Sequence, residues 1–186
     1  MSKLDYVISY ETMMIETADH PEYSTKIIDK NKGIIYSKRP AKTLIKESAL
    51  YHNQSIKGHI EVVKSKYPSM KKIPLMINST LSIIMIPTSS QSNNTCKWLN
   101  FIQINKYLKE KKQTKIQFRN GEETILPISY YIFDKQMSKA TKIISMYLSQ
   151  KVEYKLKSEE ERLKMIKELL EEYIEEEKNR ERKFKT

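Results

Sequence analysis

The longest apolar stretch of the chain, residues 81–87, limits the folds that are open to it. A second apolar run, residues 73–77, precedes it, and a short polar segment, residues 78–80, separates the two. Such runs predict two buried strands, the second closed by Pro87. The stretch is far shorter than the roughly 18 residues that a membrane span needs. Because the first part of the chain also lacks an apolar signal core, we expect a soluble, cytoplasmic protein.

Other short segments rich in isoleucine, valine, tyrosine and threonine also predict strands. They cover residues 4–15, 25–28, 33–37, 98–105 and 114–118. Asn120-Gly121 predicts a type I′ hairpin turn after the last of them, because that turn needs positive φ at both central positions. We interpret residues 106–112 as a basic linker and residues 55–66 as a short helix.

Two helices are expected in the C-terminal part. Apolar residues at helical spacing run from Phe133 to Leu148, and a second helix starts at Ser158, where Glu161 completes a capping box. The apolar face of the second helix is interpreted as a surface for packing, oligomerisation or activation. It carries Leu163, Ile166, Leu170 and Tyr173.

The predicted fold class follows from these elements. It is α+β, with a mixed, mostly antiparallel sheet with hairpins, followed by two C-terminal helices. We expect a basic DNA-binding domain over residues 1–150, and an amphipathic helix with a charged tail over residues 151–186.

The positive charge of the chain is unevenly distributed. The formal net charge is +11, and residues 1–150 carry 23 basic and 12 acidic side chains, whereas residues 151–186 carry 11 of each. The excess is densest in residues 26–72 and 97–119, and it indicates an anionic partner such as nucleic acid. A compositional origin stays open, because 29 of the 34 basic residues are lysine, a bias that the base composition of a genome can produce.

The cysteine, glycine and histidine content of the chain gives little indication of a catalytic or metal-binding function. A lone cysteine, Cys96, excludes an internal disulfide and a zinc site built on CxxC pairs. Three glycines are too few for a phosphate-binding loop. His52, His59 and Glu61 form only a weak metal set, and ordinary surface histidines are the commoner case. We therefore expect no enzymatic activity, no cofactor and no metal.

Nucleic-acid binding agrees better with the basic residues. Lysines neutralise phosphates, and arginine inserts into narrow, A·T-rich minor grooves. Arg39 precedes Pro40, and Arg119 stands beside the Asn120-Gly121 tip, where it would act as a prong. An ordinary surface position is an equal alternative for each arginine. The candidate DNA contacts are Lys38, Arg39, Lys42, Lys57, Lys106, Lys109, Lys111, Lys112, Lys115, Arg119 and Asn120.

One segment, residues 118–136 (FRNGEETILPISYYIFDKQ), resembles the ComK competence transcription factors. The agreement extends over most of residues 25–175. Its further parts are residues 73–88, Gly58, the run Cys96-Lys97-Trp98-Leu99 and residues 162–166. His59 stands where the family usually has arginine, so the resemblance adds His59 to the candidate DNA contacts.

The resemblance implies a cytoplasmic, nucleoid-associated activator of DNA-uptake genes that reads A·T-rich promoter boxes through the minor groove. The implied partners are double-stranded DNA, RNA polymerase, further copies in a dimer or tetramer, and an adaptor-protease complex. A different class stays open, in which the chain is a non-sequence-specific binder of RNA or ribosomes that uses its lysines and tyrosines. A protein-interaction module built on the C-terminal apolar face is a third possibility.

Overall fold

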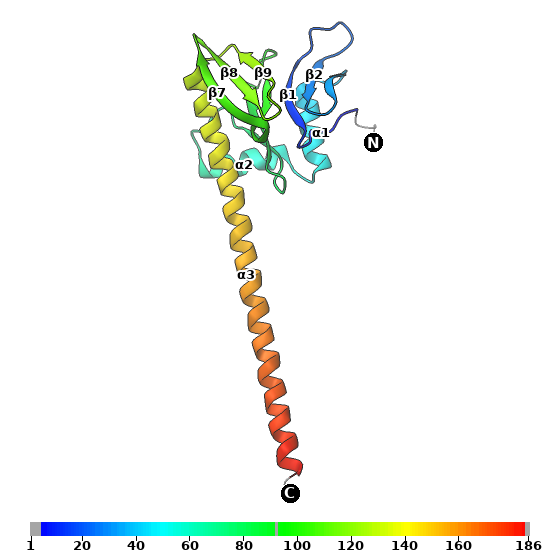
Figure 1. The fold of residues 1–186 in the computed structure, drawn as a ribbon, viewed down its shortest axis with the longest axis vertical. Coiled ribbons are helices and arrows are strands. Elements are labelled where there is room, and N and C mark those ends of the chain that lie inside the picture. Colours follow the sequence, from blue (N-terminus) through cyan, green and yellow to red (C-terminus); the bar gives the residue numbers. More distant parts are fainter. Residues whose placement is uncertain (1–4, 92, 185–186) are drawn as a thin grey trace. The chain divides into compact units, whose positions relative to one another are not determined.

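The protein is described by a computed structural model that covers residues 5–91 and 93–184, with the side chains of residues 172–174 and 176–184 left aside. It divides into two units, Met1–Ile144 and Ser145–Thr186. The first holds two antiparallel sheets and two short helices, and a long helix, α3, begins in it (Figure 1). The α+β class with antiparallel sheets and hairpins is therefore confirmed.

The larger sheet has six strands in the order β3-β2-β1-β6-β5-β4, and each neighbouring pair is antiparallel. The strands are β1 (Thr12–Thr17), β2 (Thr25–Asp29), β3 (Gly33–Ser37), β4 (Leu75–Asn78), β5 (Ile83–Pro87) and β6 (Trp98–Asn100). The two apolar runs near the middle of the chain form β4 and β5, and every residue of β5 is buried. Thus both predicted buried strands are confirmed.

The first strand is shorter than predicted. β1 begins at Thr12, because a turn that links Thr12 N–H to the Ser9 carbonyl (3.3 Å) precedes it. Ile8 lies before that turn, where its N–H donates to the Ser48 hydroxyl (2.9 Å) and its side chain is fully buried. Apolar residues in this segment therefore serve the core without joining the sheet.

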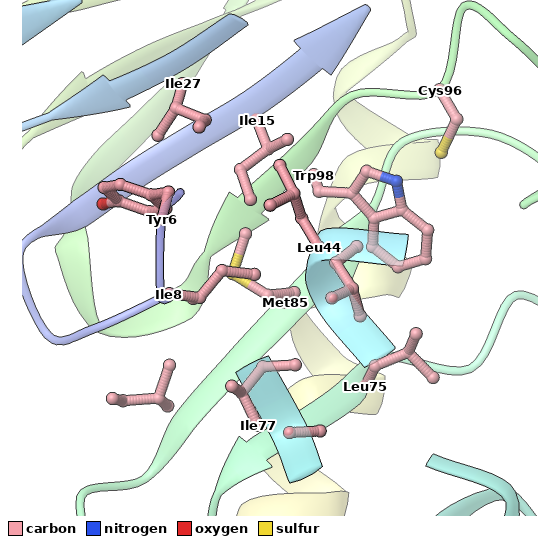
Figure 2. Close-up of a cluster of buried hydrophobic side chains, with 13 residues drawn as sticks. Tyr6, Ile8, Ile15, Ile27, Leu44, Leu75, Ile77, Met85, Cys96 and Trp98 are labelled. Carbon is pink, nitrogen blue, oxygen red and sulfur yellow. The ribbon is translucent and has the colours of Figure 1, made fainter. Parts of the chain in front are cut away.

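Two helices contribute the rest of the main core, α1 (Ala41–Tyr51) and α2 (Ile56–Lys66). The prediction of a helix over residues 55–66 is confirmed, and Ser55 caps α2 by accepting a hydrogen bond from Gly58 N–H (3.2 Å). Figure 2 shows Leu44 of α1 in one cluster with Trp98 and Met85 of the sheet. Cys96 is buried beside the indole and belongs to this packing.

The smaller sheet has the order β7-β8-β9 and follows a short 3-10 turn, η1 (Phe101–Gln103). Its strands are β7 (Ile104–Glu110), β8 (Gln113–Phe118) and β9 (Glu123–Leu126). The prediction of a basic linker over residues 106–112 is wrong, since most of it is β7. Tyr107 holds this strand in place, because its ring meets Phe133 (5.2 Å between centroids) and its hydroxyl donates to Asp134 (2.7 Å).

The C-terminal part is one helix, α3 (Tyr130–Phe184), where two were predicted. Ser158 lies inside α3, and its hydroxyl donates to the Lys155 carbonyl (3.1 Å) instead of capping a helix start. Residues 149–158 contain neither proline nor glycine, so nothing breaks the helix there. In its first turns Gln136 donates to the carbonyls of Pro87 (2.8 Å) and Lys72 (3.1 Å), which joins α3 to the larger sheet.

Candidate nucleic-acid interface

The hairpin between β8 and β9 presents Arg119 and Asn120 at its tip, where both side chains are exposed. Gly121 N–H donates to the Phe118 carbonyl (3.0 Å), and Gly121 alone takes a left-handed φ of +91°. The turn therefore differs from the predicted type I′ and has the three-residue form with glycine in the left-handed position. The Asn120 carboxamide oxygen accepts from Glu122 N–H (3.1 Å), which stiffens the tip.

Two hydrogen bonds hold Arg119 in place. Its backbone N–H donates to the Gln103 carbonyl (2.9 Å), and its guanidinium Nε donates to the Ile102 carbonyl. The Nε bond uses one edge of the guanidinium and fixes the direction of the side chain. Because guanidinium carries five N–H donors, the terminal nitrogens keep donors for a ligand.

The opposite end of the same sheet carries a second basic tip. Lys111 and Lys112 form the two-residue turn between β7 and β8, and Lys111 takes a left-handed φ of +52°. A strand rises about 3.4 Å per residue, so the length of β8 separates the two tips by ~17 Å. The predicted DNA contacts at the two tips therefore cannot form one compact group of side chains.

The strand register distributes the remaining lysines of the smaller sheet over its two faces. Lys115 pairs across the strands with Leu108 and Ile125 on one face, both of them about half exposed. Lys106 pairs with Gln117 on the same face as Lys115, whereas Lys109 pairs with Thr114 on the opposite face.

One of these lysines is already paired with a carboxylate. Lys115 Nζ lies 2.6 Å from a carboxylate oxygen of Glu123, and this hydrogen bond and charge raise the pKa of Lys115. A phosphate near Lys115 must compete with Glu123. Lys106 has no ion pair among the residues that the structure describes.

Arg39 lies between two acidic residues. Its Nε lies 3.4 Å from Asp5, and its Nη1 contacts both carboxylate oxygens of Glu47. These carboxylates come from the N-terminal segment and from α1, so they compensate the charge of Arg39 within the fold. The neighbouring lysines, Lys38 and Lys42, are exposed.

His59 is buried, with only 4% of its surface exposed, and its Nε2 lies 2.8 Å from the Pro74 carbonyl oxygen. Burial lowers the pKa of His59 from its ordinary value of 6.5, which favours the neutral ring. A side chain that is this deeply buried cannot contact DNA in this fold, so we do not retain His59 in the candidate interface. Lys57, two residues earlier on α2, is exposed.

A further cluster, formed by Lys72, Lys135 and Lys139, was not predicted from the sequence. Lys139 of α3 donates to the Lys71 carbonyl (2.8 Å) and to the Gln136 carboxamide oxygen (2.7 Å). Burial and the nearby charges of Lys72 and Lys135 lower the pKa of Lys139, so this point has a concentrated positive potential. The four-residue spacing of Lys135 and Lys139 on a predicted helix was the available signal, but their approach to Lys72 depends on tertiary structure.

The apolar face predicted near the C-terminus is exposed to solvent. Leu163, Ile166 and Leu170 expose 62%, 43% and 56% of their surface. The side chain of Tyr173 lies outside the described residues. Earlier in α3, Val152 and Leu156 expose 57% and 61%, so the exposed face extends back toward residue 152.

Metal-binding and membrane-spanning features are absent from the part of the chain that the structure describes. Within the described ranges, there is no group of three or more residues suited to hold a metal ion. None of the helices described is long and apolar enough to cross a bilayer. Fold and surface together define a basic α+β protein that presents lysine and arginine on hairpin tips and helices.

Comparison with known proteins places this chain among its relatives. A sequence model described as ComK protein matches residues 3–153. The competence transcription factor of Bacillus subtilis (strain 168) is 26% identical over 154 residues, which cover 76% of this chain and 78% of that protein. No solved structure matches. The chain belongs to the ComK family, as the resemblance of residues 118–136 indicated.

Proposed function

We propose that the protein is a sequence-specific, DNA-binding transcription activator of competence genes that reads A·T-rich promoter boxes through the minor groove. The observation that carries the proposal is the fixed, exposed position of Arg119 at the β8–β9 tip. The relative from Bacillus subtilis, a competence transcription factor, supports the same function.

The hairpin tip has the shape and chemistry that a narrow groove requires. The minor groove is about 6 Å wide, so it admits a single inserted side chain more readily than a helix. A·T-rich sequences narrow this groove further and concentrate negative potential in it, which attracts arginine. Gln103 and Ile102 hold Arg119 before DNA arrives, so less conformational entropy is lost on binding.

The lysines contribute phosphate contacts, which position the protein without reading sequence. Those of the proposed interface are Lys38, Lys42, Lys57, Lys106, Lys109, Lys111, Lys112 and Lys115, and the cluster of Lys72, Lys135 and Lys139 extends it. Arg39 has a lesser role, because Asp5 and Glu47 already compensate its charge.

Self-association through α3 would bring two DNA-binding units to one promoter. Leu156, Leu163 and Leu170 recur every seven residues, and Val152 and Ile166 lie four residues before Leu156 and Leu170. This is the a and d pattern of a two-stranded coiled coil, with Glu159 as one polar interruption. The helix is thus proposed as the assembly element, and contact with RNA polymerase as the route to activation.

A mobility-shift assay tests the proposal with an A·T-box duplex and a G·C-rich duplex of equal length. Arg119→Ala should weaken binding to the A·T box by about tenfold, within the range for an arginine that reads a groove, and should change G·C binding little. Lys30→Ala, an exposed lysine outside the interface, is the matched control.

Competition and strand preference complete the assay. A minor-groove ligand should displace the protein from the A·T box. Equal affinity for the two duplexes, unaffected by that ligand, would refute minor-groove readout. Tighter binding to single strands than to either duplex would favour the RNA-binding alternative.

A further inference from the structure

A hollow of about 360 Å³ lies between α1, α2 and the larger sheet. Its lining is mainly apolar, with Ile45 from α1, Ile56 from α2, Leu75 from β4 and Trp98 from β6. Leu75 and Trp98 belong to the cluster drawn in Figure 2, so the base of the hollow is the core itself. This volume lies within the range of sites that bind ligands or anchor side chains.

Three lysines stand around this apolar hollow. Lys42 and Lys46 lie one turn apart on α1, and Lys57 lies on the first turn of α2. All three are exposed. Among the residues described as lining the hollow there is no carboxylate, and the acidic neighbour Glu47 is engaged by Arg39. The result is an apolar hollow with a positively charged rim.

We propose that this hollow is a docking site for an acidic peptide segment of a partner protein, with a large apolar side chain flanked by aspartate or glutamate. The apolar side chain would enter the hollow against Trp98 and Leu75, and the carboxylates would pair with the lysines of the rim. Such a site combines a buried anchor with charges that steer the approach and fix the register.

The extent of the apolar surface favours a peptide over the other occupants. Leu50, which lines the hollow, is 56% exposed, and its neighbour Tyr51 is 64% exposed, so apolar surface continues beyond the cavity. A small molecule that filled the hollow would leave this surface uncovered. DNA phosphates would pair with the lysines but would offer no apolar group to Trp98.

Binding can be followed directly, because Trp98 is the single tryptophan of the chain. The probe is a short synthetic peptide without tryptophan, in which leucine and phenylalanine are flanked by aspartate and glutamate, labelled for fluorescence anisotropy. We expect it to bind and to change the Trp98 emission. One control peptide carries lysine flanks and another has serine in place of the apolar anchors, and both should bind at least about tenfold more weakly.

Variants of the full chain then locate the site. The double variant Lys42→Glu/Lys57→Glu should bind the acidic peptide about tenfold more weakly. Leu50→Ser should weaken binding by roughly fivefold through lost apolar contact, and its exposed position keeps the fold intact. Lys30→Glu, which lies away from the hollow on the β2–β3 turn, should have no effect. The unchanged far-UV circular dichroism of each variant confirms folding.

Two results would overturn the proposal. One is peptide binding that leaves the Trp98 emission unchanged or is insensitive to both sets of variants, since the peptide then binds elsewhere. The other is acidic-peptide binding that Leu50→Ser leaves unchanged and that persists when serine replaces the apolar anchors. That pattern would show that the lysines attract carboxylates without use of the hollow. Because the peptide assay contains no DNA, failure of the proposed DNA readout leaves it intact.

Discussion

Gln136 is the residue at which a single change tests how α3 is joined to the larger sheet. Its side chain is 2% exposed, and its amide nitrogen donates to the carbonyls of Pro87 and Lys72. Gln136→Met removes both donors and the acceptor that Lys139 uses. It keeps an unbranched side chain of similar length, so packing changes little.

The expected cost follows from the hydrogen bonds. Each bond contributes a net ~1 kcal/mol, and a buried carbonyl that loses its donor adds a desolvation penalty of about 1–3 kcal/mol. The penalty is smaller for the Lys72 carbonyl, because Lys72 is exposed and water can replace the lost donor. We therefore expect the free energy of unfolding to fall by about 2–3 kcal/mol, which for a chain of this size lowers Tm by roughly 5–10 °C.

Urea unfolding followed by Trp98 fluorescence measures this change, because Trp98 lies in the core of the larger sheet. The midpoint should fall and the m-value should stay constant, as for a loss of stability without a change in compactness. Gln113→Met, at an exposed position at the start of β8, should change stability by less than about 0.5 kcal/mol. A Gln136→Met variant as stable as the wild type would refute the assigned role of these hydrogen bonds.

Three further changes test other parts of the molecule. Burial lowers the pKa of His59, so its contribution to stability is full above about pH 6.5 and is lost as the pH falls through the folded-state pKa. His59→Gln should therefore flatten the fall in unfolding free energy between about pH 7 and pH 5, and an unchanged slope would contradict this. Leu163→Glu/Ile166→Glu should convert an oligomer to a monomer in light scattering without changing Trp98 emission; a persisting oligomer would exclude this face from assembly. Lys72→Ala/Lys139→Ala should reduce the slope of log affinity against log salt by about 1–2 for both duplexes, as for lost phosphate contacts, and an unchanged slope would remove the cluster from the interface.

Strands that are buried on both faces can be predicted from local sequence alone. The runs that form β4 and β5 are almost entirely apolar, so their pattern needs no tertiary information. β3 and β8 expose part of their residues, and their β-branched and aromatic residues predicted them. β7 was missed because Lys106, Leu108 and Lys109 are all exposed on it, and alternation is lost when neither face is fully covered. Its pairing with β8 and the contacts of Tyr107 with α3 order this segment, and both depend on tertiary structure.

Prediction of the site depended more on tertiary contacts. The exposed hairpin tip with Arg119 followed from the local Asn120-Gly121 signal, although the turn type did not. The ion pairs of Arg39 involve Asp5 and Glu47, which come from other elements, and local sequence gives no sign of them. The burial of His59 depends on the carbonyl of Pro74, which lies beyond the end of α2.

The position of β1 in the larger sheet determines when the sheet can be completed during protein synthesis. β1 lies between β2 and β6, and its pairs Met14–Leu99 and Ile15–Trp98 join residues that are more than 80 positions apart. Contacts of such long range form slowly, because a long loop must close first. During synthesis at about 5–20 residues per second, the β1–β3 ribbon therefore waits several seconds with one edge of β1 unpaired. Newly made chains are thus most exposed to aggregation and to chaperone binding in the interval before β6 emerges from the ribosome.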